Sequence, residues 1–270
     1  IGIRPQLKYK KGEVFLNASI NSLDRSFESF NSFSGGTNVF VYKGTSVNLD
    51  LVNKYEFTKN FQLITGINYQ KHENETISDF GNIDPDLANF NVVDPYVSAV
   101  YITDFGLSIN AGGRLNIHSN YGNNFVYDTN LAFGLVKNET INLKLISAFI
   151  APSLYQLFSD FGAIDLNPES NTTFEFGFES WLGDKLQVNA VYFDRVEEDK
   201  VIFQNLSVAP FGIYANAAED IKTTGIEADI SYAVSKDVKA RFGYTYINKS
   251  DDVDYIPSNK LTASIEANPF

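Results

Sequence analysis

The feature that most limits the fold of this chain is an alternation of apolar and polar residues that recurs along most of its length. It is clearest at residues 107–117, where the odd positions are mainly apolar, as at Ile109, and the even positions polar, as at Asn110. A period of two places successive side chains on opposite faces of a β-strand. We therefore predict about 13 strands, most of them with one apolar and one polar face, and no helix. The segment 1–9 is only weakly patterned, and 96–103 has apolar residues on both faces.

The connections between these segments alternate between short and long. Short turns are expected at 10–12, 58–60, 104–106, 137–139, 182–185 and 235–237, and long connections at 24–44, 71–91 and 149–177. Prolines, Pro95 among them, are expected in loops or at strand ends, except Pro5 in an edge strand. Short turns at one end of the strands and long loops at the other are typical of an antiparallel transmembrane β-barrel.

A soluble β-sandwich is the alternative, because its strands also alternate. Two features favour the barrel. Several segments reach about nine to 11 residues, whereas strands of soluble proteins have about five or six. Aromatic residues also gather at segment ends on the apolar side, as at Tyr55, Phe57 and Phe61, where a barrel places its aromatic girdle.

Composition excludes several classes of function. The net charge is −12 and no basic patch is present, which argues against a nucleic-acid partner. The chain has no Cys, no phosphate-binding loop and no nucleophile motif, so we predict neither an enzyme nor a bound cofactor. No Met occurs either, so residue 1 is not a natural start. No run of 18 apolar residues occurs, which excludes a transmembrane helix.

Metal binding is not predicted. Acidic residues crowd two loops, at Asp79, Asp84, Asp86 and Asp94 and again at Asp251, Asp252 and Asp254. Their spacing matches no EF-hand loop. His72 and His118 are isolated in the sequence, which argues against a two-histidine site.

Regular alternation stops in the long connection at 149–177, where Pro, Gly, Asp and aromatic residues mix. Its aromatic residues Tyr155, Phe158 and Phe161 argue against disorder. A structured loop of this length is usually functional.

The same connection carries a family resemblance. Ala151-Pro152-Ser153-Leu154-Tyr155-Gln156-Leu157-Phe158, Leu166-Asn167-Pro168-Glu169 and Phe174-Glu175-Phe176-Gly177 resemble the central barrel pattern of TonB-dependent outer-membrane receptors. Further matches follow in the family's order, at 113–114, 119–122, 192–193, 201–202, 214–216, 225–227, 244–246 and 256–257. The set is most similar to the cobalamin and siderophore branch.

The resemblance implies a barrel of about 22 strands plugged by an N-terminal domain. Residues 1–270 would then form part of a single barrel domain, incomplete at both ends and without the plug. The implied function is uptake of a scarce large nutrient, such as siderophore-bound iron or cobalamin, across the bacterial outer membrane with energy from TonB. The implied partners are membrane lipid, the plug, TonB and a small-molecule or metal-chelate ligand. A passive porin-like barrel and a soluble β-sandwich binding domain are the alternatives.

Candidate site residues follow from this assignment. The outer-loop aromatics Tyr155, Phe158 and Phe161 are candidates for binding substrate. Charged residues on the polar side are expected to face the lumen and the plug, namely Arg114, Glu169, Glu175, Glu227 and Arg241. Gly177 and Gly225 lie on the same side, where a missing side chain would let the plug backbone approach.

Overall fold

A computed structural model describes residues 1–270 except 33–34, 79–80, 137, 251–255 and 268–270. The strands are β1 (Gly2–Ile3), β2 (Gln6–Tyr9), β3 (Gly12–Asn31), β4 (Gly36–Thr58), β5 (Phe61–Ser78), β6 (Asn89–Ile102), β7 (Leu107–His118), β8 (Gly122–Val136), β9 (Glu139–Ile150), β10 (Glu169–Leu182), β11 (Leu186–Glu198), β12 (Val201–Asn205), β13 (Gly212–Asn216), β14 (Ile221–Ala233), β15 (Val238–Lys249) and β16 (Asn259–Ala267). One short helix, α1 (Leu154–Phe158), follows β9.

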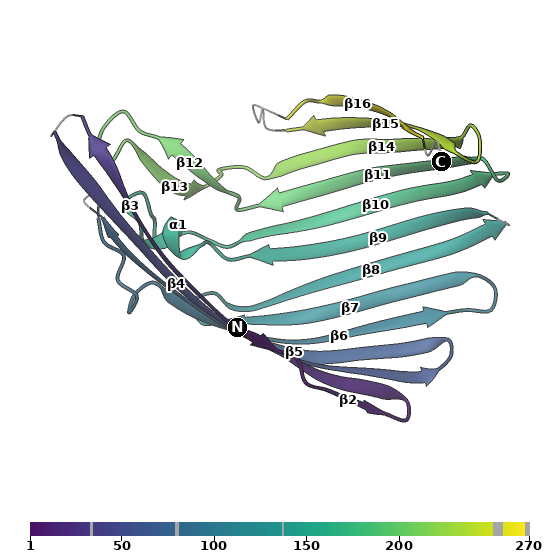
Figure 1. Ribbon diagram of the computed structural model, residues 1–270, viewed down its shortest axis with the longest axis horizontal. Coiled ribbons are helices and arrows are strands. Elements are labelled where there is room, and N and C mark those ends of the chain that lie inside the picture. The colour runs from purple at the N-terminus through teal and green to yellow at the C-terminus, as the bar shows by residue number, and fades with distance from the viewer. Residues whose placement is uncertain (33–34, 79–80, 137, 251–255, 268–270) are drawn as a thin grey trace.

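All strands except β12 and β13 form one curved antiparallel sheet in which neighbours along the chain pair (Figure 1). It contains 14 strands, and β1 and β2 share one position because both pair with β3. Strands β12 and β13 form a separate hairpin between β11 and β14. The sheet does not close among the described residues, so the predicted open, all-β arrangement is confirmed.

Three strands extend beyond their predicted ends. The connections expected at 24–44 and 71–91 largely continue β3, β4 and β5, and the β3–β4 ladder reaches Asn31 and Gly36. Stacked aromatic rings support this extension, since Phe27 lies 4.6 Å from Phe40, measured between ring centroids. The Ser- and Asn-rich composition was misleading because an outer hairpin can have water on both faces.

Two further expectations were wrong. Pro95 lies inside β6 rather than at a strand end, and there the ladder to β7 is interrupted between Val93 and Tyr96 because proline has no N–H. The helix α1 was also not expected. It forms because Ser153 and Gln156 make a capping box, in which each side chain accepts a hydrogen bond from the other residue's backbone N–H. Pro5 separates β1 from β2 at the sheet edge, where a missing donor is tolerated.

The register between neighbouring strands aligns apolar residues in one row across the sheet. Cross-strand partners on one face join β7 to β15 through Ile109, Leu131, Leu143, Phe176, Tyr192, Ile226 and Tyr246. Many large apolar side chains of this face are exposed, including Leu143 and Phe176. The opposite face carries the polar partners, such as Lys144 opposite Glu175. The sheet therefore has an apolar and a polar face, as the alternation predicts.

The polar face is the concave one. Tyr155 of α1 shares a pocket with Tyr42 of β4, and its ring centroid lies 6.2 Å from that of Tyr214 in β13. In a flat sheet, β4 and β11 would lie about 34 Å apart, because seven steps of ~4.8 Å separate them. A single short helix can lie near both β4 and the β12–β13 hairpin only if it is on the concave side of the sheet, where Figure 1 shows α1. The long connections gather at that end of the sheet, and the short turns lie at the other.

A small apolar core holds the helix in place. Leu154 is buried together with Ile83 and Ala88, and Phe90 and Phe158 pack against these three side chains. The segment with Ile83 folds back onto β5 through paired backbone hydrogen bonds with Thr76. Within the described part of the chain, no helix is long and apolar enough to cross a membrane.

Candidate functional site

The segment between β9 and β10 is held in a defined shape at the mouth of the curved sheet. Leu154 and Leu157 bury one side of α1, while Tyr155 remains partly exposed on the other. The chain then turns back, and the N–H of Ala163 donates to the carbonyl of Gln156 over 3.0 Å. Gly162 fits this turn because a Cβ there would collide with backbone atoms of Leu157 and Ser159.

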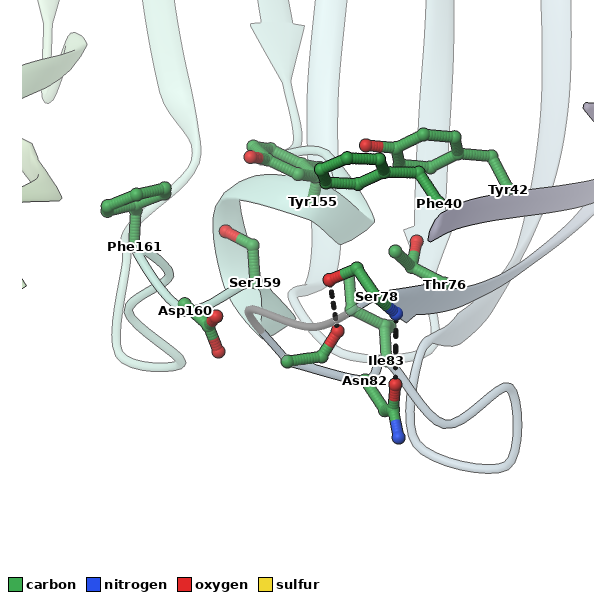
Figure 2. A pocket seen from close by; sticks show the side chains of 11 residues that line it. Phe40, Tyr42, Thr76, Ser78, Asn82, Ile83, Tyr155, Ser159, Asp160 and Phe161 are labelled. Atoms are coloured by element: carbon green, nitrogen blue, oxygen red, sulfur yellow. Dashed lines mark hydrogen bonds between the residues drawn. The ribbon is translucent and has the colours of Figure 1, made fainter. Parts of the chain in front are cut away.

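A cavity of about 300 Å³ lies between this segment and strands β4 and β5 (Figure 2). The aromatic side chains that line it are Phe40, Tyr42, Tyr155 and Phe161. The polar side chains that line it are Thr76, Ser78, Asn82, Ser159 and Asp160. In Figure 2 the rings of Tyr155, Phe40 and Tyr42 lie along one side of the cavity. We call this cavity the mouth pocket.

The hairpin β12–β13 extends the aromatic surface beside the mouth pocket. Phe203 makes edge contacts with Phe161 and Tyr214, at 5.8 and 5.2 Å between ring centroids. The N–H of Tyr214 donates to the carbonyl of Phe161 over 2.8 Å. Asn216 secures the base of the hairpin by donating to the carbonyl of Asn167 over 3.0 Å. Three separated segments thus form one aromatic surface.

The predicted aromatic residues divide into two groups. Tyr155 and Phe161 line the mouth pocket together. Phe158 instead packs against the small core and does not line this cavity. Burial raises the pKa of the Tyr155 phenol, and the neighbouring Tyr214 and Tyr42 add to this effect. A tyrosine is neutral at physiological pH even without this shift, so the phenol can donate a hydrogen bond.

Sequence reasoning missed the pocket partners Phe40, Tyr42, Phe203 and Tyr214, and it missed Asp160. Phe40 and Tyr42 occupy every second position of β4 on the face of Asp50, so period two could have placed them on the polar side. They were overlooked because their segment was expected to be a loop. No local pattern connects them with Tyr155, more than a hundred residues away.

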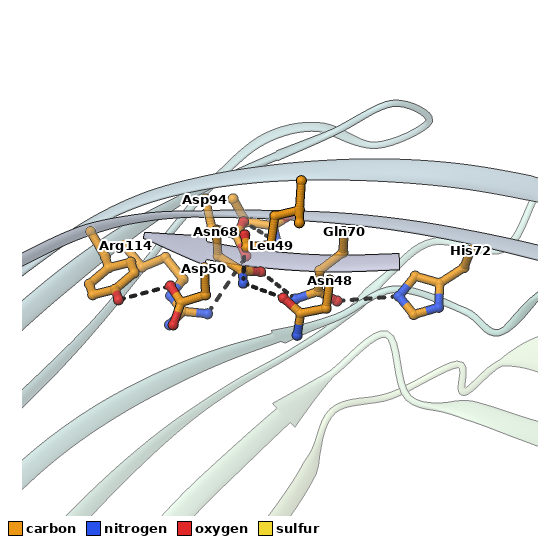
Figure 3. A network of polar contacts seen from close by, with 10 residues as sticks. Asn48, Leu49, Asp50, Asn68, Gln70, His72, Asp94 and Arg114 are labelled. Carbon is orange, nitrogen blue, oxygen red and sulfur yellow. Dashed lines mark hydrogen bonds and ion pairs between the residues drawn. The ribbon is translucent and has the colours of Figure 1, made fainter. Parts of the chain in front are cut away.

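Polar side chains form a network on the concave face of β4–β7 (Figure 3). Asp94 is buried and accepts a hydrogen bond from Asn116 over 2.9 Å, and it pairs with Arg114 at 3.6 Å. The Arg114 guanidinium also lies over the ring of Tyr96, whose hydroxyl donates to Asp50 over 3.0 Å. These contacts satisfy a carboxylate that would be costly to bury alone.

The network continues toward the mouth along one strand. The Gln70 amide donates to Asn68 over 2.7 Å, Asn68 donates to Asn48 over 2.8 Å, and His72 contacts Gln70 at 3.3 Å. Alternate positions of β5, from Asn68 through Gln70 to His72, therefore carry linked polar side chains, and Asn68 connects them to Asn48 of β4.

The other charged candidates have individual partners on the same face. Glu175 pairs with Lys144 at 2.8 Å, and Glu227 lines the same groove. Glu169 accepts a hydrogen bond from the backbone N–H of Val201 over 3.0 Å, which ties β10 to the β12–β13 hairpin. Arg241 pairs with Glu266 at 3.4 Å near the short turns, where both side chains are exposed.

The glycines on the polar face differ from one another. The ring of Phe193 covers Gly225, and a Cβ at this position would overlap the ring. The space that was expected to admit the plug backbone is therefore occupied by this side chain. A Cβ on Gly177 would meet only ordinary contacts with Asn142 and Val191.

No group of three or more potential metal ligands of the His, Cys, Asp or Glu type occurs among the described residues. Asp84 accepts from the N–H of Asp86 in a turn, and Asp94 is bound to Arg114 and Asn116. Asp79, Asp251, Asp252 and Asp254 lie outside the described residues.

Comparisons with solved structures agree with the fold. The copper transporter OprC matches with a TM-score of 0.78 and 17% identity, covering 94% of this chain and 47% of that one. The siderophore receptor PirA from Acinetobacter baumannii matches with a TM-score of 0.77 and 14% identity, covering 99% and 47%. A mutant of the ferric enterobactin receptor PfeA from Pseudomonas aeruginosa, in complex with enterobactin, matches with a TM-score of 0.74 and 14% identity, covering 100% and 47%.

The chain thus spans about half the length of these solved structures. No curated protein matches it in sequence. The family model described as "TonB dependent receptor-like, beta-barrel" matches residues 4–268. The chain therefore belongs to the TonB-dependent receptor β-barrel family, whose barrels lie in the outer membrane of Gram-negative bacteria.

Proposed function

We propose that the protein is an active-transport receptor that takes up a scarce large nutrient, such as a siderophore-bound metal ion or cobalamin, with energy delivered by TonB. The observation that carries the proposal is the mouth pocket, which lies on the concave face at the end with the long connections. Aromatic rings with a few convergent polar groups form the usual surface of a small-molecule site. The names of the similar structures, which include siderophore receptors and a copper transporter, support a metal-containing ligand.

A passive porin-like barrel is the second candidate. It is less favoured because α1 and its flanking turns lie within the curve and contact the β12–β13 hairpin. An inward-folded aromatic segment narrows the path and presents a binding surface. Retention of a solute at such a surface suits a receptor better than rapid diffusion through a pore.

We further propose that the chain is part of a single barrel domain whose remaining strands and plug complete the lumen. The open sheet edges at β1–β2 and β16 support this proposal. In the complete protein, Arg114, Glu175 and Glu227 would face the plug from the concave wall, and Glu169 and Arg241 would lie nearer its two rims. The same assignment makes the protein a carrier rather than an enzyme.

Growth of a deletion strain tests the proposed function. The strain should lose growth on one defined source among iron chelates, cobalamin and copper, and the full-length gene should restore it. Removal of TonB should abolish growth on that source even when the gene is present. Normal growth of the deletion strain on every source, or restored growth without TonB, would contradict active transport.

Variants connect the phenotype to the mouth pocket. Tyr155→Ala and Phe161→Ala should weaken ligand binding by about tenfold or more each, as loss of a stacked ring does. Phe105→Ala is the matched control, because Phe105 is an exposed aromatic residue in a short turn at the opposite end. Equal effects of all three substitutions would place the binding surface elsewhere.

A further inference from the structure

The mouth pocket has an unusual balance of charge. Among the described residues that line it, Asp160 is the only charged one, and no Lys, Arg or His is present. The four aromatic rings add the negative potential of their faces. An anionic ligand group would therefore meet repulsion in this cavity, whereas a cation would not.

Asp160 is available to a ligand. No other described residue makes a hydrogen bond or ion pair with its carboxylate. Gly81 lies directly against the carboxylate oxygens, and a Cβ at that position would overlap them. Gly81 has a φ of 151°, which also favours glycine. The absence of a side chain at Gly81 therefore leaves space for the Asp160 carboxylate beside the pocket, and the charge of this carboxylate is not neutralised.

A second polar group in the cavity lacks a partner. Thr76 is 5% exposed, and its hydroxyl oxygen has no hydrogen-bond partner among the described residues. Figure 2 shows this hydroxyl pointing toward the rings of Phe40 and Tyr42. Buried polar atoms are normally paired, so an unpaired hydroxyl in a pocket indicates a place for a ligand atom. The oxygen can accept a hydrogen bond from an N–H group.

We propose that the mouth pocket binds a positively charged organic group of the ligand, an ammonium or guanidinium, between the aromatic rings and Asp160. The rings attract the cation through their faces, the carboxylate supplies the opposite charge, and Thr76 accepts one hydrogen bond. This inference rests on the proposed function, because it describes the ligand that the receptor would carry. It selects a chelate with a cationic arm over a uniformly anionic one.

Two small probes of equal shape test the charge preference. Choline and 3,3-dimethylbutan-1-ol differ in the central atom, which is a charged nitrogen in the first and a neutral carbon in the second. Neither probe has an N–H, so the comparison tests the charge separately from the hydrogen bond to Thr76. Binding of each to the full-length protein in lipid nanodiscs is measured by ligand-observed NMR titration. Choline should bind at least about fivefold more tightly, the ratio expected for a cation at aromatic faces. Equal affinities, or no detectable binding of either probe, would overturn the proposal.

The isosteric substitution Asp160→Asn assigns the preference to the carboxylate. It should reduce the choline affinity about threefold or more while leaving the neutral probe unchanged, because only the charge is removed. Asp165→Asn is the matched control, since Asp165 lies in the same segment, is exposed and does not line the cavity. A preference for choline that survives Asp160→Asn would contradict the assignment. The comparison of probes on the unaltered protein stands even if a variant does not fold.

This experiment and the growth assay can fail separately. A deletion strain without any uptake defect, together with a clear choline preference, would remove the proposed transport function and leave the cation site. A confirmed uptake defect with equal probe affinities would remove the cation site alone.

Discussion

Leu143→Arg is the sharpest test of which face of the sheet meets lipid. Leu143 lies four residues after Glu139, where β9 begins. At about 3.3 Å per residue and a strand tilt of about 40°, its depth from the strand start is about 10 Å. The apolar band of such barrels is about 25 Å tall, so this position lies close to the membrane midplane.

The expected cost follows from this depth. An arginine on the lipid face near the midplane should cost about 2–4 kcal/mol, because its charge loses water in the hydrocarbon. Asn142→Arg is the matched control one residue away. Asn142 lies on the polar face in a groove that Glu175 and Glu179 also line, so an arginine there should cost at most about 1 kcal/mol.

The assay is a denaturant titration of the full-length barrel folded into lipid vesicles. A graded control comes from Ile109, which shares the apolar row but lies only two residues into β7, at about 5 Å depth. Ile109→Arg should therefore cost less than Leu143→Arg, about 1–2 kcal/mol. Equal costs at Leu143 and Asn142 would refute the assignment of faces. A larger cost at Asn142 would mean that the polar face lies outward.

Three further outcomes follow from the packing of single residues. Arg114→Met should lower the stability of the full-length protein by about 1–3 kcal/mol in thermal unfolding, because it leaves the buried Asp94 carboxylate without its cationic partner. Adding Asp94→Asn should recover part of this loss, and no recovery would contradict this cause. Gly225→Ala should cost about 1–3 kcal/mol by overpacking, whereas Gly177→Ala should be nearly neutral. Ser153→Ala should cost about 1 kcal/mol of local stability, seen as faster amide exchange in α1; unchanged exchange would exclude the capping role.

The wall of the barrel could be predicted from the sequence because each strand carries its own information. The alternation in 107–117 fixes which side of β7 is apolar, and a turn such as that at 104–106 fixes its pairing with the preceding strand. Register then aligns Ile109 with Leu131 without any long-range information. The family resemblance added the cellular location and the expectation that further strands close the barrel, which no single strand encodes.

The site could be predicted only in part, because its contacts are not local. Tyr155 and Phe161 were found from the aromatic content of their own segment. Their partners Phe40 and Tyr42 lie in β4, in a stretch whose polar composition resembles a loop although it continues a strand. The strand persists because β3 and β5 pair with it on both sides, which its own sequence does not show.

Curvature is the physical link between the wall and the mouth pocket. A flat sheet with the same register would leave α1 in contact with at most a few adjacent strands. Bending brings the polar face of β4 and the β12–β13 hairpin to opposite sides of the same helix, so that Tyr42 and Tyr214 both lie near Tyr155. The proposed ligand surface is therefore a consequence of the sheet's curvature, and its composition can change in the long connections without altering the register that holds the wall together.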